Sequence, residues 1–392
     1  MIERNLRLFK WDNFLGGLWP LSSLAIVYFE KITASYTIAT AVFAVSALMT
    51  TFMEIPAGIF SDTMGRRKTL LFSPILVFIA FLCWALAGQF SCIWLLFLGA
   101  LAFGTSGAIA SGTLDALVYE TMEELNKKGD FNVQYAKNGG WNQVGLAFSA
   151  IAGAVITYFF SLQVLAWISV VPALLQIGVI YFFVEPKRIE NIKKTNSYKH
   201  FLIAFRRLWR NKKLKFYATI ELIDNAFGMA SFRFEGAYYQ TLVADWLINL
   251  ARFLKQICGI ISFFAVPYIR KIGMIRLFFG SMILNVLVRV FGVVLNNGIT
   301  PFIMSAVNLF YGTAKTASSD IMQKEFSPNQ RATIQSIISF LSGILMAFSM
   351  VFLGFIGDLY GPKTAIIMAI GVKMMVVIVS VFLLHKKPKK FF

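Results

Sequence analysis

The sequence predicts an all-α membrane protein in which twelve transmembrane helices form two pseudo-symmetric bundles of six. Three observations predict this fold. Hydrophobic residues make up 58% of the 392 residues and charged residues only 14%, whereas an average soluble domain is about 45–50% apolar and about 25% charged. Apolar runs long enough to cross a bilayer recur along the whole chain, and two short patterns of the first half return in order in the second.

The apolar runs place the expected helices. A bilayer-spanning helix takes about 20 residues, and suitable runs lie at 11–30, 36–60, 69–90, 92–122, 139–160, 164–184, 216–242, 246–269, 275–295, 299–322, 332–356 and 363–384. The first run follows three basic residues and is not closed by a small-residue cleavage site, so we expect a retained helix rather than a signal peptide. The spacing predicts an N-terminal bundle at 1–184, a basic cytoplasmic linker at 185–215 and a C-terminal bundle at 216–392.

Basic residues predict the orientation of these helices. Lys and Arg total 37 and Asp and Glu 19, a formal net charge of +18. Most of the cations fall in loops on the side of the N-terminus, and only Lys31 and Lys363 fall in loops on the other side. Because Lys and Arg in short loops resist translocation, we expect a multi-pass protein of the plasma (inner) membrane with both termini in the cytoplasm. This topology accounts for the excess of basic over acidic residues, so no nucleic-acid partner is expected.

Two sequence patterns suggest an internal repeat. The pattern Asp-Asn-x-x-Gly starts at Asp12 in the first expected helix and again at Asp224 in the seventh, an offset of 212 residues. The fourth and tenth helices share Gly-Thr with an acidic residue further on, at Gly112 and Gly312, an offset of 200. Two matches at the same ordinal helices are typical of tandem-repeat transporters.

The segment Gly58–Lys68, GIFSDTMGRRK, carries the most information. Asp62 and Arg66 lie four residues apart, so a carboxylate and a guanidinium can pair across one helical turn. Gly58 and Gly65 permit close helix approach and a tight turn. The simpler interpretation is a positively charged cytoplasmic turn, which is a real alternative for Arg67 and Lys68.

This segment resembles the signature G-x-x-x-D-x-x-G-R-[RK] of the major facilitator superfamily. A degenerate counterpart, PYIRKIGMIR, lies at 267–276 between the eighth and ninth helices, and the run SPNQRAT at 327–333 is also similar to that family. With the 6 + 6 layout, the resemblance covers the whole chain. It implies two six-helix bundles that alternate by a rocker-switch motion, and a central cavity lined by helices 1, 4, 7 and 10.

The resemblance also implies a conformational latch formed by Gly58, Asp62, Gly65, Arg66 and a carboxylate of the fourth helix, either Glu120 or Glu123. Two departures bear on the substrate. Thr63 replaces the arginine usual after the aspartate of the signature, which weakens the latch but keeps its central pair. The fourth helix has no arginine and the fifth has no Gly-Pro pair, so a multidrug antiporter is disfavoured.

Ionisable residues inside apolar runs mark the expected site. A charge at the bilayer centre costs about 2.5–3.5 kcal/mol on insertion scales, so such residues are expected to face a wet cavity or a partner. The substrate-cavity candidates are Asn13, Arg233, Glu235, Lys255, Lys315 and Tyr238. We place Arg233 and Glu235 near the middle of the seventh helix, where an electropositive cavity suits an anionic or zwitterionic solute. A structural bridge between the cations and Glu235 or Asp245 is the alternative.

Proton coupling and gating are assigned to other acidic residues. Glu54 and Asp115 are the proton-coupling candidates, because a buried carboxylate takes up a proton more readily. The alternative for Glu54 is that it only ties the second helix to the eleventh. The cytoplasmic-gate candidates are Asp12, Asp224 and Asp320. In the repeat at offset 200, Asp115 corresponds to Lys315, which suggests a gate pair across the cavity; local partners for each are the alternative.

These features predict a secondary active transporter of a small organic solute, coupled to protons and working as a monomer in the lipid bilayer. Two other functions stay open: a lipid or lysolipid translocator, and a non-transporting membrane receptor with the same fold. No nucleophilic, hydrolytic or metal-ligand constellation is present in the sequence, so enzymatic activity, a metal and a cofactor are not expected.

Overall fold

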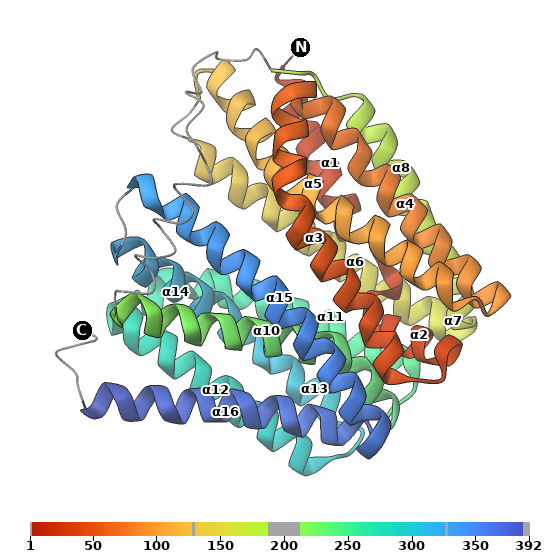
Figure 1. The fold of residues 1–392 in the computed structure, drawn as a ribbon, viewed down its shortest axis with the longest axis vertical. Coiled ribbons are helices and arrows are strands. Elements are labelled where there is room, and N and C mark those ends of the chain that lie inside the picture. The colour runs from red at the N-terminus through yellow and green to blue at the C-terminus, as the bar shows by residue number, and fades with distance from the viewer. Residues whose placement is uncertain (1, 128–129, 187–211, 326–327, 387–392) are drawn as a thin grey trace. The chain divides into compact units, whose positions relative to one another are not determined.

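A computed structural model describes residues 2–127, 130–186, 212–325 and 328–386 of the chain (Figure 1). The chain forms two compact units. Unit 1 comprises Met1–Ile192 with Ala244–Phe253, and unit 2 comprises Lys193–Val243 with Leu254–Phe392. Most of the predicted linker and the start of the segment at 327–333 fall outside the described residues.

Helices account for nearly all of the described chain. The first part contains α1 (Arg4–Gly17), η1 (Pro20–Ser23), α2 (Ala25–Thr33), α3 (Tyr36–Met64), α4 (Arg66–Phe90), α5 (Ile93–Glu124), α6 (Phe131–Phe159), α7 (Leu162–Ile168) and α8 (Val170–Tyr181). The second part contains α10 (Lys212–Gln240), α11 (Asp245–Ile269), η3 (Arg270–Ile272), α12 (Met274–Leu295), α13 (Thr300–Ser305), η4 (Ala306–Phe310), α14 (Tyr311–Glu325), α15 (Pro328–Tyr360) and α16 (Pro362–Lys386).

The all-helical membrane fold is confirmed, but the count of twelve spanning helices is not. Within the described residues, eight helices are long and apolar enough to cross a membrane. The predicted run at 11–30 is divided into α1, η1 and α2, because Pro20 starts a new helical turn without an N–H to donate. The run at 299–322 is divided into α13, η4 and α14. The helices α10 and α11 are continuous but carry several charged residues each.

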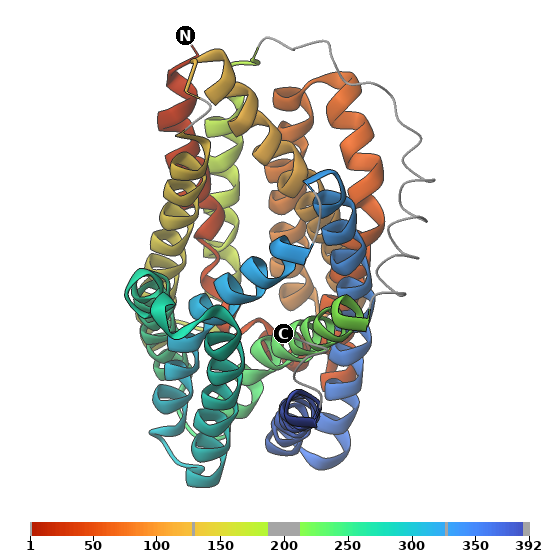
Figure 2. The same ribbon diagram turned by 90° about the vertical axis from the view of Figure 1, so that its left-hand side faces the viewer.

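Unit 1 is organised by two sets of neighbouring helices. The helix α5 packs between α3 and α4, while α1 packs against α6 and α8 (Figures 1 and 2). Aromatic rings fill the space near α4 and α5, where Trp19 stacks on Trp84 at a centroid distance of 5.7 Å. At the crossing of α1 and α6, Gly17 and Gly145 let the two backbones meet, because a Cβ on Gly145 would lie 2.1 Å from the carbonyl oxygen of Phe14.

The internal repeat is visible in the hydrogen bonds and turns of the two units. Gly65 precedes α4 with φ +105°, and Gly273 precedes α12 with φ +94°. Seven residues into these helices, the hydroxyl of Ser73 lies 3.0 Å from that of Ser106, and in unit 2 the hydroxyl of Ser281 lies 2.8 Å from that of Thr313. These equivalent contacts give offsets of 207 and 208 residues.

This register corrects the predicted match between the fourth and tenth helices. It pairs Thr313 with Ser106, whereas the offset of 200 pairs it with Thr113. The shared Gly-Thr dipeptide is therefore coincidental, and Lys315 corresponds to Ala108 rather than to Asp115. The suggestion that Asp115 and Lys315 form a gate pair by symmetry loses its basis, and each stays a separate prediction.

Candidate functional site

The turn between α3 and α4 consists of one residue. The helix α3 ends at Met64 and α4 begins at Arg66, so Gly65 alone reverses the chain. Its backbone, at φ +105° and ψ 153°, lies in a region that is essentially restricted to glycine. The tight turn that the signature predicts at this glycine is present. Gly58 behaves differently, since no atom of the described residues would approach a Cβ there within 4 Å.

Arg66 connects three helices at this end of unit 1. Its Nη1 donates to Asp62 Oδ1 at 2.7 Å, and its Nε donates to Glu120 Oε1 at 2.9 Å. The Arg66 side chain is 12% exposed and that of Asp62 59%. The cluster thus joins α3, α4 and α5 through one guanidinium, with Glu120 rather than Glu123 in contact. Because Asp62 and Glu120 accept hydrogen bonds from different nitrogens of the planar guanidinium, they hold the Arg66 side chain in one orientation.

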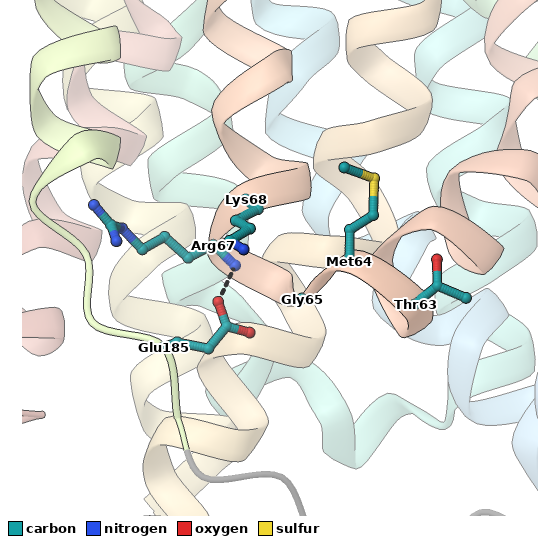
Figure 3. A pocket seen from close by; sticks show the side chains of 6 residues that line it. All are labelled: Thr63, Met64, Gly65, Arg67, Lys68 and Glu185. Atoms are coloured by element: carbon teal, nitrogen blue, oxygen red, sulfur yellow. Dashed lines mark hydrogen bonds between the residues drawn. The ribbon is translucent and has the colours of Figure 1, made fainter.

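Glu185 is a fourth member of this site that the sequence prediction missed (Figure 3). Its two carboxylate oxygens accept hydrogen bonds from the backbone N–H groups of Arg66 at 2.6 Å and Arg67 at 2.8 Å. These are the first two N–H groups of α4, which lack partners within the helix, and an anion there is favoured by the helix dipole. A hollow of about 270 Å³ beside this contact is lined by Thr63, Met64, Gly65, Arg67, Lys68 and Glu185.

Further contacts hold the chain after α8 in place around Glu185. The Asn5 amide donates to the carbonyl oxygen of Val184 at 2.8 Å, and the Val184 N–H donates back to Asn5 Oδ1 at 2.9 Å. Arg67 donates to the carbonyl oxygen of Tyr181 at 2.6 Å. Arg67 therefore has a defined hydrogen-bond partner and is more than a positive charge in a cytoplasmic turn.

A second group of charges is buried in unit 2. Glu235 Oε1 accepts a hydrogen bond from Arg289 Nη1 at 3.0 Å, and Glu235 Oε2 accepts one from Lys255 Nζ at 2.5 Å. The three side chains are 2%, 5% and 4% exposed, respectively. We call these three residues the buried triad. Ser231 accepts a further hydrogen bond from Arg289 at 3.0 Å, so the triad joins α10, α11 and α12.

The triad lies nearer a helix end than expected. Glu235 is five residues before the end of α10 at Gln240, so the predicted mid-helix position is wrong. The predicted run at 216–242 ends only two residues later, so the error lies in the depth assigned to Glu235 and not in the bounds of the helix. The structural bridge between Lys255 and Glu235, proposed as an alternative, is present.

The other cavity candidates are dispersed. Tyr238 is fully buried and its hydroxyl donates to Asn296 Oδ1 at 3.0 Å. The Asn13 amide donates to the carbonyl oxygen of Phe9 on its own helix at 2.8 Å. Lys315 is exposed, with its Nζ 3.5 Å from the Tyr311 hydroxyl, and Arg233 is half-buried.

The acidic candidates divide by burial. The Glu54 and Asp115 side chains are exposed in unit 1. Asp12 is 3% exposed and accepts a hydrogen bond from Gln176 Nε2 at 2.8 Å. Asp224 forms an ion pair with Lys373 at 2.9 Å. The side chain of Asp320 lies outside the described residues.

The residues that sequence reasoning missed are partners contributed by distant helices. Arg289 and Lys373 are cations inside apolar runs, which is a usable signal, but nothing in the sequence identifies their partners. Gln176 and Glu185 gave weaker signals: an amide inside an apolar run, and a carboxylate directly after one.

Long apolar helices, a glycine turn that recurs at Gly65 and Gly273 and charged clusters within the helices are typical of a multi-pass membrane protein of the transporter class. The profile of the Major Facilitator Superfamily matches residues 13–348. The chain belongs to this superfamily, which confirms the resemblance seen in its sequence.

Comparison with known proteins adds relatives and structures of the same fold. An uncharacterised transporter of Buchnera aphidicola subsp. Acyrthosiphon pisum is 29% identical over 147 residues, which cover 38% of this chain and 35% of that protein. A variant of the nucleoside transporter NupG superposes with a TM-score of 0.82 at 14% identity, over 97% of this chain and 99% of that one.

Two further solved structures are similar to the chain. A POT family transporter in complex with 5-aminolevulinic acid has a TM-score of 0.75 at 12% identity, over 99% of this chain and 97% of that one. A D-xylose–proton symporter has a TM-score of 0.73 at 13% identity, over 96% of each chain. At such identities the likeness shows the shared fold.

Proposed function

We propose that this protein is a secondary active transporter that moves a small organic solute, coupled to protons, by rocker-switch alternation between the two bundles. The single observation that supports this most is the Arg66 cluster. In this cluster the signature arginine contacts both Asp62 and Glu120 at one end of unit 1, at a turn whose backbone geometry recurs at Gly273 in unit 2. We place both termini in the cytoplasm of the inner membrane.

The Arg66 cluster suits a latch that opens and closes. Asp62 is mostly exposed, and its Oδ1 atom accepts the hydrogen bond from Arg66. The family resemblance implies that the aspartate of the signature also caps the N-terminus of the eleventh helix. Because an i,i+4 ion pair on a helix contributes only about 0.3–0.5 kcal/mol, making and breaking it is compatible with repeated cycling.

The buried triad supports an anionic or zwitterionic substrate. It contains two cations and one carboxylate, so these three side chains together add one positive charge to unit 2. A fixed positive charge in a medium of low dielectric favours an anionic group nearby. A zwitterion such as 5-aminolevulinate, which one similar transporter binds, is a suitable first probe, and uridine, D-xylose and dialanine complete a panel.

The first experiment is thermal stabilisation of the purified protein by this panel. A ligand at about 100 times its Kd adds about 2.7 kcal/mol of stability. We expect saturable stabilisation by a zwitterionic or anionic member. Stabilisation by lysophospholipid alone would favour the lipid translocator, and no stabilisation by any compound would favour the non-transporting receptor.

The second experiment measures transport directly. The protein is reconstituted in liposomes, and uptake of the stabilising solute is followed with an inward proton gradient. We expect accumulation that a protonophore abolishes, and a marked loss in Asp62→Asn with Glu30→Gln as a matched control. Uptake that follows the solute gradient alone, with or without protonophore, contradicts proton coupling.

A further inference from the structure

The two halves of the chain hold equivalent aspartates in different chemical settings. Asp12 and Asp224 begin the repeated Asp-Asn-x-x-Gly pattern, and each contacts the last helix of its own half of the chain. On α8 the partner of Asp12 is Gln176, and on α16 the partner of Asp224 is Lys373. The distances are similar, 2.8 Å and 2.9 Å, but one partner is a neutral amide and the other a cation.

Burial adds to this difference. Asp12 is 3% exposed, whereas the Asp224 side chain is 35% exposed. An ionised carboxylate loses the free energy of hydration when it is buried. If no cation lies nearby to compensate, the protonated form is favoured. A carboxylate in contact with an ammonium group stays ionised. The same position in the repeat therefore provides a proton acceptor in unit 1 and a fixed ion pair in unit 2.

The charged groups around Asp12 do not neutralise it. Within the described residues, Asp12 forms no ion pair, and Gln176 is its side-chain hydrogen-bond donor. On its own helix, the Lys10 ammonium lies 4.0 Å from the ring centroid of Trp141, and Arg4 donates to the carbonyl oxygen of Phe182. The remaining ionisable groups of α1, α6 and α8 are Arg7, Tyr135, Lys137, Tyr158 and Tyr181. The helix α5 also contacts α1, through Asn5 and Thr121, and its ionisable residues are Asp115, Tyr119, Glu120, Glu123 and Glu124.

We infer that Asp12 is the residue that takes up and releases the coupling proton, and that Asp224, which is paired with Lys373, is its counterpart in the second half of the chain. This assignment rests on the proposed proton coupling and replaces a gating role for Asp12. The proton binds Oδ2, because Oδ1 accepts the Gln176 hydrogen bond, and it leaves to water when movement of α1 exposes the carboxylate. Gln176 is a positioning residue in this step.

A spectroscopic test needs no substrate. Infrared difference spectra of the purified protein between mildly alkaline and mildly acidic pH report protonated carboxyl groups. We expect a carboxyl band that is lost in Asp12→Asn and kept in Asp224→Asn. The variant Gln176→Lys reproduces the unit 2 arrangement in unit 1, so it should also lose the band although Asp12 is present. A band that persists unchanged in Asp12→Asn overturns the assignment.

Transport measurements distinguish a failure of the Asp12 assignment from a failure of the proposed proton coupling. If the pH gradient drives uptake in the wild type, we expect Asp12→Asn and Gln176→Lys to lose uphill uptake of the stabilising solute by at least tenfold and to retain solute exchange. Asp12→Glu should recover part of the uphill uptake. Unchanged uphill uptake in both variants overturns the role of Asp12. Absence of gradient-driven uptake in the wild type contradicts proton coupling instead, even if the infrared band assigns a titrating Asp12.

Discussion

The Oε1 atom of Glu185 accepts a hydrogen bond from the backbone N–H of Arg66 at 2.6 Å, although 119 residues separate the two along the chain. With the second bond to Arg67, this carboxylate supplies the N-terminal cap that α4 lacks locally, since Gly65 has no side chain to cap it. The segment that follows α8 is thereby fixed to the turn that carries the signature motif.

Removing this cap should destabilise unit 1. We expect Glu185→Ala to lower the free energy of unfolding by about 1 kcal/mol, the usual cost of a lost N-cap, and Glu185→Gln to lower it less because one amide oxygen can still accept. Thermal unfolding in detergent measures both. Glu30→Ala, whose side chain makes no such contact in the described residues, is the control; an equal loss there would show that the cap contributes nothing.

The two repeat-related glycines should differ in their tolerance of a side chain. Both need a positive φ, so Gly65→Ala and Gly273→Ala each introduce backbone strain of about 1–3 kcal/mol. At Gly65 the new Cβ would also lie 3.0 Å from Glu185 Oε1, whereas at Gly273 no atom is within 4 Å. We expect the larger loss of thermal stability in Gly65→Ala, and Glu185→Ala should remove most of the difference between them.

The crossing of α1 and α6 should not accept a methyl group. In Gly145→Ala the Cβ would meet the Phe14 carbonyl oxygen at 2.1 Å, so the helices must separate at a cost of about 1–3 kcal/mol. Gly178 in α8 has nothing within 4 Å, and Gly178→Ala should instead gain about 0.5–1 kcal/mol from helix propensity. Unfolding temperatures that move the same way in both variants would argue against this close contact.

Breaking the buried triad should cost more than removing it. Glu235→Ala leaves two buried cations facing each other, which is expected to cost about 3–5 kcal/mol. Replacing Glu235, Lys255 and Arg289 together by Met removes all three charges and is expected to be nearly neutral for folding. If the triple variant transports normally, the triad has no part in the electropositive field proposed for the substrate.

Much of the fold was predictable from local patterns. The apolar runs gave most of the helix positions, because a membrane helix must bury its backbone polar groups within one continuous segment. The runs at 11–30 and 299–322 were less well predicted, since hydropathy does not reveal where a helix is interrupted. The Gly-Thr match at Gly112 and Gly312 was misleading, because a dipeptide repeats by chance whereas the Ser73–Ser106 and Ser281–Thr313 contacts depend on geometry.

The candidate site was predictable where its members lie close in sequence. Asp62 and Arg66 are one helical turn apart, so their ion pair followed from helix geometry alone. Glu120 was identified only through the family resemblance. Glu185 was not identified, because the N–H groups that it caps belong to a helix more than a hundred residues away.

The order of residues along the chain already established an apolar, helical membrane protein with a repeated pattern and a signature turn. Those features depend on short-range physics: hydropathy over about 20 residues, one helical turn, one glycine. Only the tertiary structure decided which charges neutralise one another. Asp12 and Asp224 stand in the same local pattern, yet one contacts an amide and the other an ammonium. The chemistry of a buried carboxylate depends on neighbours that long-range packing brings to it, and the local sequence does not specify them.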